Sequence, residues 1–542
     1  MQKRKPEKLQ PPDPDESERL VSLESDGSET RLGASKEKGS GKGKQSWPNR
    51  HLAVTTMLVS LGGGFVFGYQ LLITNPAQAA FIEFVDHSYN KTHGEGKDAK
   101  TIEFIWGIIV SSFFWGATIG SLLIQTVSDR LGRKIGILVM FIIQNVACAL
   151  EILSHFADNY ILYSIARILL GIAISIAIGI GPMFIIECRR ITSGFIPQMS
   201  LNRVRFISFV VCFLNQGEES PVAVRGLVSM STGVLLQCGL VVGSITAMPE
   251  IWGTYDLWWA IYGFELILTI AITIMLLFSK ESPTYLVAKG KEDQAKNSIV
   301  YYHGITESEA EALIEAMKSD TKGEKPTSLF GIFKDKKWLC GFWVGIGIMF
   351  GTIMCGVAVV NAFAFTILLG VGLDSLQASI GNLIICIMAV VGVLTSSQFV
   401  ERLGRRPLLI VTFAALAIIN IFIAGFMYSF AQTGIMAIGW GVVVSCCLFN
   451  LFFAAGPGPL CFFVPGELIC AKNRSATYTW LNIVMNGVRS ILLAVYFPIE
   501  DALGPPLCYF VLFFPPCFFA VLLCYFYLPE TTGLTPEEAS SV

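Results

Sequence analysis

Ser128–Lys134 reads SDRLGRK, and Val400–Arg406 reads VERLGRR. Each copy places an acid, an Arg, a Gly and two basic residues in a short polar stretch after a long apolar run. Gly132 and Gly404 allow a tight turn, because a residue without a Cβ tolerates backbone conformations that strain other residues. One copy could be a basic turn on the cytosolic side of a membrane protein and nothing more. Two copies with the acid at the same offset indicate a chain of two similar halves.

The apolar runs around these turns are long enough to cross a bilayer. A helix of about 20 residues spans roughly 30 Å of hydrocarbon, and lipid offers no partner for free backbone groups, so helices are expected. The chain has 542 residues, 53% hydrophobic and 15% charged, whereas a soluble domain has about 25% charged residues. We predict an all-α, multi-pass membrane protein with twelve spans, near 52–74, 104–126, 135–154, 159–186, 227–248, 257–279, 338–362, 375–398, 407–430, 434–465, 477–498 and 506–528.

Charge divides the chain further. The first 50 residues are polar and Lys-rich, which predicts a disordered tail on the cytosolic side. The charged stretch between the halves predicts a cytosolic linker, in which Glu307–Met317 has helical composition. An even number of spans places both termini on the same side. The predicted parts are a tail (1–50), a six-helix bundle (51–279), a linker with short helices (280–335), a second six-helix bundle (336–530) and a cytosolic C-terminal tail (531–542).

Acids and arginines at the cytosolic helix ends predict a gate. Glu467 and Arg474 follow the tenth span, and Glu187 ends the fourth span. Carboxylates and guanidiniums form bidentate ion pairs. Such pairs would close the cytosolic mouth in one state and break in the other, as alternating access requires. The candidate gate residues are Asp129, Arg130, Arg133, Glu187, Arg225, Glu401, Arg405, Arg406, Glu467 and Arg474.

Together with further short motifs, the two turns resemble the sugar-porter family of major facilitators, in particular the animal facilitative hexose carriers. The resemblance implies a major-facilitator fold, with two six-helix bundles around a central cavity. It implies movement of a small organic solute by alternating access, in a membrane we expect to be the plasma membrane. We find no catalytic constellation, and expect no enzyme activity, cofactor, metal or nucleic-acid partner. The further motifs are Phe67–Tyr69, Ala166–Gly171 (ARILLG), Glu281–Pro283, Gly456–Pro459 and Pro529–Thr531.

Most sugar-contacting residues of the family are missing. The seventh span of the family resembles QQLSGIN, whereas residues 352–358 read TIMCGVA. The fifth-span Gln falls at Gly233 and the eighth-span Asn at Ala389. Losing a polar contact costs about 1–3 kcal/mol, so we expect poor glucose affinity. The candidate cavity residues are Gln70, Gly233, Gln237, Thr352, Ile353, Ala358, Asn361, Ala389, Phe462, Asn482 and Asn486.

Two interpretations remain open at this point. The cavity carries a different, less polar or flatter solute, or the fold is kept while transport is lost and the protein acts as a sensor or partner. Proton-coupled members have an acid just after the Gly-Tyr pair of the first span, where this chain has Gln70. A buried ionisable residue is the usual proton carrier in a membrane, so Gln70 favours passive uniport. Glu265, inside the sixth span, is interpreted as a paired or lipid-shielded structural acid.

The loop predicted after the first span, Ile82–Thr101, contains the triplet Asn90-Lys91-Thr92. This pattern is a glycosylation acceptor when it lies in an external loop. Such triplets also occur by chance. We predict that Asn90 is extracellular and glycosylated.

One segment departs from the family pattern. Glu187 and Arg225 are 225 − 187 = 38 positions apart, whereas the corresponding pair in the second half is 474 − 467 = 7 apart. Removing the 31 residues of 189–219 leaves ECSPVAVR and restores the spacing of 7. Its apolar run, Phe206–Leu214, is too short to cross a bilayer. We interpret 189–219 as a retained intron or mispredicted exon rather than a functional loop, and expect a form lacking it to be at least as stable.

Overall fold

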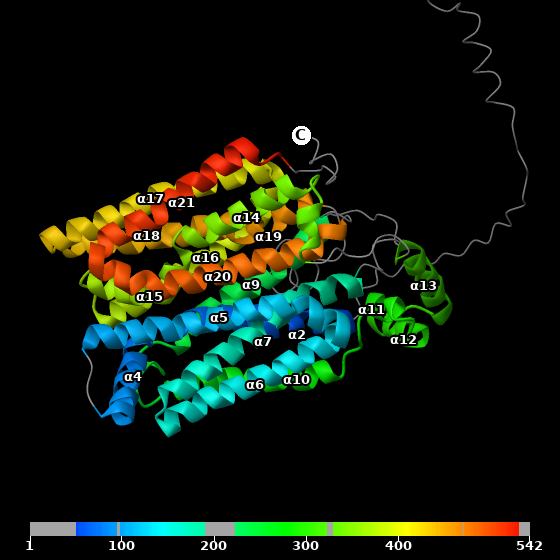
Figure 1. Ribbon diagram of the computed structural model, residues 1–542, viewed down its shortest axis with the longest axis horizontal. Coiled ribbons are helices and arrows are strands. Elements are labelled where there is room, and N and C mark those ends of the chain that lie inside the picture. The colour runs from blue at the N-terminus through cyan, green and yellow to red at the C-terminus, as the bar shows by residue number, and fades with distance from the viewer. Residues whose placement is uncertain (1–49, 95–97, 190–222, 322–328, 470, 531–542) are drawn as a thin grey trace, which may run out of the picture. The chain divides into compact units, whose positions relative to one another are not determined.

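The computed structural model describes residues 50–94, 98–189, 223–321, 329–469 and 471–530 (Figure 1). By their internal contacts, the described residues belong to one compact unit. The predicted tails and the insert lie outside the described residues, apart from Arg50 and Arg189. Our expectations for them, and the domain limits, stay predictions.

Helices build this unit, and the described residues contain no strand. Among these residues, eleven helical segments are long and apolar enough to cross a membrane. The predicted span that is not among these eleven is the fifth, 227–248, which corresponds to α9, and its Gly233–Thr246 part is a shorter apolar helix. Their outward side chains include apolar residues such as Ile142 and Ile267, which are 52% and 72% exposed. Lipid is the solvent in which such surfaces are stable, so the all-α membrane architecture is confirmed.

The two halves occupy separate parts of the ribbon diagram (Figure 1). The N-terminal half comprises α2 (Arg50–Ser60), η1 (Leu61–Phe65), α3 (Val66–Leu72), α4 (Gln78–His93), α5 (Ala99–Leu131), α6 (Arg133–Ala157), α7 (Tyr160–Arg189), α9 (Ala223–Thr246) and α10 (Trp259–Leu277). The connection contains α11 (Pro283–Ala288), α12 (Glu292–His303), α13 (Glu307–Thr321) and η3 (Gly331–Lys334). The C-terminal half comprises α14 (Leu339–Met354), α15 (Val357–Gly370), α16 (Ser375–Leu403), α17 (Arg405–Thr433), α18 (Met436–Ala455), α19 (Pro457–Leu468), α20 (Ala471–Leu503) and α21 (Pro505–Tyr527).

The short helix expected in the linker is confirmed, because α13 covers all of Glu307–Met317. The outer loop expected after the first span is wrong, because most of it is helical in α4. Asn90 therefore lies in a helix, where its Nδ2 donates to Asp86 Oδ1 at 3.3 Å and its Oδ1 is buried. This arrangement lends no support to a glycosylated loop, and modification of Asn90 stays a prediction.

Three spans are interrupted inside the protein. The first contains the π-helical turn η1, whose sequence is LGGGF. The seventh breaks at Gly356, whose φ of +112° favours glycine. The tenth breaks at Gly456, which precedes Pro457, a residue that has no N–H to continue the helix. Irregular backbone at membrane depth is tolerated where protein buries it or where it borders a cavity, so these breaks mark the region to search for a site.

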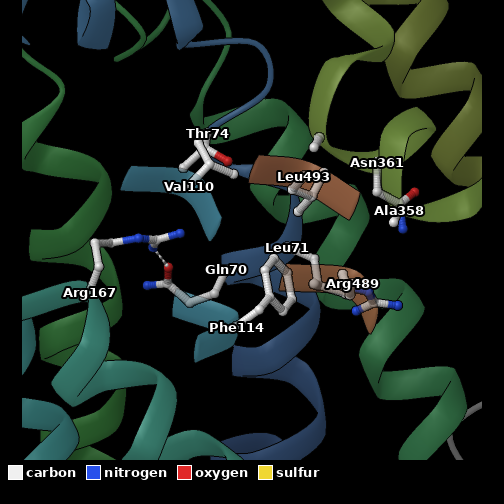
Figure 2. Close-up of a pocket in the computed structure, with 11 residues that line it drawn as sticks. Gln70, Leu71, Thr74, Val110, Phe114, Arg167, Ala358, Asn361, Arg489 and Leu493 are labelled. Atoms are coloured by element: carbon white, nitrogen blue, oxygen red, sulfur yellow. Dashed lines mark hydrogen bonds between the residues drawn. The ribbon is translucent and has the colours of Figure 1, made fainter. Parts of the chain in front are cut away.

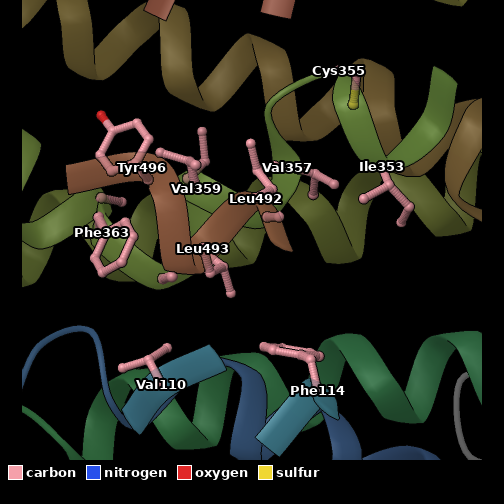
Figure 3. Packing of buried hydrophobic residues seen from close by; sticks show 14 of the residues in the cluster. Val110, Phe114, Ile353, Cys355, Val357, Val359, Phe363, Leu492, Leu493 and Tyr496 are labelled. Carbon is pink, nitrogen blue, oxygen red and sulfur yellow. The ribbon is translucent and has the colours of Figure 1, made fainter. Parts of the chain in front are cut away.

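The halves meet along α5 and α20, which lie side by side in Figure 1. Figure 3 shows Val110 and Phe114 of α5 on one side of the contact and Leu492 and Leu493 of α20 on the other. A second contact joins α9 to α16. Because these contacts are mainly apolar, the halves bury a continuous core.

Candidate functional site

A small cavity lies between the halves, bordered by the segments that follow two of the interrupted helices (Figure 2). α3, α5 and α7 border it on one side, and α15 and α20 on the other. It has room for about one water molecule, so this conformation holds the cavity contracted. Its lining residues are Gln70, Leu71, Thr74, Val110, Phe114, Arg167, Ala358, Asn361, Ala362, Arg489 and Leu493.

Gln70, Ala358 and Asn361 are the predicted cavity residues that the structure brings together there. Other predicted polar residues bond within their own helices: the Thr352 hydroxyl donates to the Ile348 carbonyl at 2.8 Å, and Asn482 Nδ2 to the Tyr478 carbonyl at 2.8 Å. Each of these groups donates one hydrogen bond inside its own helix, and neither residue is among those that line the cavity.

The remaining predicted positions pack around the contact between the halves. Asn486 Nδ2 donates to Ser121 Oγ of the opposite half at 3.3 Å. Ala389 packs with Val393, Ala454 and Val234 in a separate apolar cluster. Ile353 is in the main core, and Phe462 packs against that core. Gln237 is buried, and its Oε1 has no hydrogen-bond partner among the described residues. A Cβ on Gly233 would have open space around it.

Gln70 links an arginine to an acid on one side of the cavity. Arg167 Nη1 donates to Gln70 Oε1 at 2.5 Å, as Figure 2 shows, and Gln70 Nε2 donates to Glu265 Oε2. Arg167 Nη1 also lies 3.8 Å from Glu151 Oε1. An amide both donates and accepts, so Gln70 can join the two charged groups. Glu265 and Glu151 are buried, with exposed fractions of 1% and 0%. Glu265 accepts a hydrogen bond from Gln70, whereas Glu151 contacts Arg167 without a hydrogen bond among the described residues.

Arg489 reaches the cavity from the opposite half. It extends from α20 and is 7% exposed. Its guanidinium carbon lies 5.2 Å from the centre of the Phe114 ring. Within the described part of the chain, its Nε and Nη1 have no hydrogen-bond partner. The sequence prediction missed Arg489 and Arg167, although an arginine inside an apolar run is itself a signal of function.

Part of the predicted gate forms one ion pair in each half. Arg133 Nε and Nη2 donate to Glu187 Oε1 at 3.0 and 2.8 Å, and Arg405 Nη2 lies 3.2 Å from Glu467 Oε1. Each pair joins helices of the same half, α6 to α7 and α17 to α19, rather than helices of opposite halves. The gate role stays a prediction.

The other predicted gate residues contribute less to these pairs. Asp129 is exposed and 4.0 Å from Arg133. Arg130 is exposed, and its carbonyl accepts from the Tyr285 hydroxyl at 3.5 Å. Arg406 Nη2 donates to the Tyr525 carbonyl at 2.7 Å. Nothing is described of the side chains of Arg225, Glu401 and Arg474.

Two acids of the quoted motifs hold the turns, a role the sequence prediction missed. Glu281 Oε1 accepts from the backbone N–H groups of Arg133 and Lys134 at 3.0 and 2.8 Å. Glu530 Oε1 and Oε2 accept from those of Arg405 and Arg406 at 3.0 and 3.2 Å. Each acid therefore satisfies the free donors at a helix N-terminus, where negative charge is stabilised.

We expect Glu467→Gln to shift the protein toward the state open to the cytosol, because it weakens the pair with Arg405. A charge-assisted hydrogen bond is roughly twice as strong as a neutral one. Cysteine labelling from each side of the membrane measures the shift. Glu292→Gln, which weakens an exposed pair with Lys318 away from the repeated turns, is the control and should leave labelling unchanged. Unchanged labelling in Glu467→Gln would show that this pair is not a gate.

The described residues also close the opposite end, near the predicted extracellular side. Asn75 Nδ2 donates to Asn382 Oδ1 at 3.3 Å, and Asn75 Oδ1 accepts from the Phe365 N–H at 2.9 Å. Lys100 pairs with Asp501 at 3.1 Å. All three contacts join the two halves, so a solute can leave the cavity at this end only if the halves move apart.

Comparison with known proteins supports the same arrangement. The sequence matches the family described as "Sugar (and other) transporter" over residues 55–189 and 207–542. It is 24% identical over 507 residues to human "Solute carrier family 2, facilitated glucose transporter member 7", covering 91% of this chain and 90% of that protein. It is 25% identical to mouse member 3, with coverages of 91% and 92%.

Solved structures with the same fold include the xylose transporter XylE from E. coli. Its partially occluded inward-open form has a TM-score of 0.68 and 17% identity, covering 90% of this chain and 99% of that one. The proton:xylose symporter form bound to 6-bromo-6-deoxy-D-glucose has a TM-score of 0.67 and 18% identity, with coverages of 91% and 98%. The predicted major-facilitator fold is confirmed.

Proposed function

The chain belongs to the sugar (and other) transporter family, and from this premise we propose that it carries a small organic solute through a membrane by alternating access, as a passive uniporter. The observation that carries the proposal is the cavity, which takes its lining from both halves. A site shared in this way changes sides when one half rocks against the other. Contacts between the halves at the Asn75 end are suited to regulate the opening there, and the gate role of the ion pairs at the other end stays a prediction.

Passive transport is supported by Gln70. It occupies the place where coupled members of the family carry an acid, and it is held between Arg167 and Glu265. An amide side chain is not ionisable, so Gln70 cannot take up and release a proton as the solute crosses the membrane. Glu265 and Glu151 are acids of this network, and the bonds of Glu265 to Gln70 and Gln144 support the structural role expected for it.

Uptake by the purified full-length chain in proteoliposomes tests the proposal. A panel of labelled hexoses, polyols and small organic acids should contain at least one solute with saturable uptake above that of empty liposomes. Glucose uptake should be weak, because the sugar-contacting amides are absent and each lost contact costs about 1–3 kcal/mol. Strong saturable uptake of glucose would contradict our assignment of the cavity, and no uptake of any solute would favour a protein that has kept the fold without transport.

A further inference from the structure

We propose that the solute of this cavity is a small monovalent organic anion whose carboxylate binds Arg489. The inference rests on the proposed transport function and names the substrate class of the same site. It starts from a charge imbalance: two arginines line the cavity, and no acid is among its lining residues.

The two arginines differ in their neighbours. Arg167 lies 3.8 Å from Glu151 and is joined through Gln70 to Glu265, so protein acids offset its charge. Within the described ranges of the chain, the Nε and Nη1 of Arg489 are buried without a hydrogen-bond partner. Its contact with the Phe114 ring is attractive but supplies no hydrogen-bond acceptor for the N–H groups.

An uncompensated guanidinium is costly in this position. A buried charge without a partner loses its hydration and gains nothing in exchange, and charged residues inside a membrane protein usually face a functional cavity or a partner. A carboxylate supplies both the missing negative charge and the missing hydrogen-bond acceptors, since its two oxygens match the fork of the guanidinium. One uncompensated positive charge matches a monovalent anion, so a dianion is a poorer fit.

The other lining residues indicate the body of the solute. Phe114, Leu71 and Leu493 form apolar walls, and Ala358 and Ala362 leave room beside them. Asn361 and Thr74 are the remaining polar lining groups, and they can orient one or two polar atoms. This lining fits a compact, flat and mainly apolar acid better than a polyhydroxylated ring, which needs many donors and acceptors.

Matched pairs of probes test the charge requirement directly. Benzoate and nicotinate are compared with benzamide and nicotinamide, which have almost the same shape and no charge. The readout is the thermal unfolding midpoint of the purified full-length protein, since a ligand that binds the folded state raises it with concentration. We expect each carboxylate to bind at least tenfold more tightly than its carboxamide. Equal binding of both members of each pair, or no binding of either carboxylate, would overturn the inference.

Arg489→Met separates a binding role from a packing role. It removes the charge and keeps a long apolar side chain beside Phe114. We expect it to weaken carboxylate binding at least tenfold, to change carboxamide binding less than twofold, and to leave the unliganded protein as stable as before or more so. Arg489→Lys should restore part of the binding. Lys337→Met, at an exposed lysine outside the cavity whose Nζ lies 5.0 Å from the centre of the Trp338 ring, is the control and should bind carboxylates as the unchanged chain does.

A structural arginine would give the opposite pattern, with a lower unfolding midpoint in Arg489→Met and unchanged preference for the carboxylate, and this result would overturn the inference. The uptake panel distinguishes the two proposals. Saturable uptake of a neutral solute that benzoate does not inhibit would leave transport standing and refute the anion site. Arg489-dependent carboxylate binding without uptake of any solute would leave the anion site standing and refute transport.

Discussion

Gly116→Ala is expected to destabilise the N-terminal half by about 3 kcal/mol or more. A Cβ at Gly116 of α5 would lie 2.1 Å from the carbonyl oxygen of Ile168 in α7. The contact is reciprocal, because a Cβ at Gly171 of α7 would lie 2.0 Å from the carbonyl oxygen of Phe113. Helices in membranes pack closely through such small residues. The clashing atoms belong to the backbone, so only a shift of a whole helix could relieve the overlap.

Thermal unfolding in detergent, together with the monodisperse fraction after extraction, measures this loss. The matched control is Gly425→Ala in α17, where nothing lies within 4 Å of the added Cβ. Ala is favoured over Gly inside a helix by about 0.5–1 kcal/mol, so the control should be unchanged or slightly more stable. Similar stability of the two variants would show that α5 and α7 do not approach as closely as described.

Arg167→Met is expected to cost about 3–5 kcal/mol, because removing one partner of a buried ion pair leaves the other charge without compensation. Glu151 and Glu265 would both lose the cation that offsets them, and both are almost inaccessible to solvent. Adding Glu151→Gln to Arg167→Met should recover a substantial part of the loss, which a simple packing defect would not allow.

The same unfolding assay gives an internal comparison between the two cavity arginines. Arg489→Met should be tolerated, since no acid within the described residues depends on Arg489, whereas Arg167→Met should not. Equal losses in the two variants would contradict the charge assignment. A double variant no more stable than Arg167→Met alone would contradict the assignment of Glu151 as its partner.

The fold followed from features that are local in sequence. The two repeated turns, the apolar runs and the helical composition of Glu307–Met317 depend on neighbouring residues, and the structure agrees with them. The prediction of an outer loop at Ile82–Thr101 was wrong because Gln78–His93 is a helix of low overall hydrophobicity. Such a helix resembles a polar loop when only apolar runs are counted.

The site was less predictable because it depends on which side of each helix faces the other half. Of the predicted cavity residues, Gln70, Ala358 and Asn361 line the cavity, but the sequence could not show that Thr352 and Asn482 bond within their helices. The meaning of a buried arginine depends on its partners, which are distant in sequence: Arg167 and Gln70 are separated by 97 positions. Sequence alone could have marked Arg489 as unusual, but not as unpaired.

The acid that holds each turn has a consequence for biosynthesis. Glu281 follows Arg133 by 148 positions, and Glu530 follows Arg405 by 125. At synthesis rates of about 5–20 residues per second, the first turn waits roughly 7–30 s for its acid to leave the ribosome. During that interval the N–H groups at the N-terminal end of α6 lack this acceptor. The preceding turn at Gly132, whose φ is +96°, is then without the bonds from Glu281. In each half, the turn between the second and third spans can therefore gain its carboxylate partner only after the sixth span has been made.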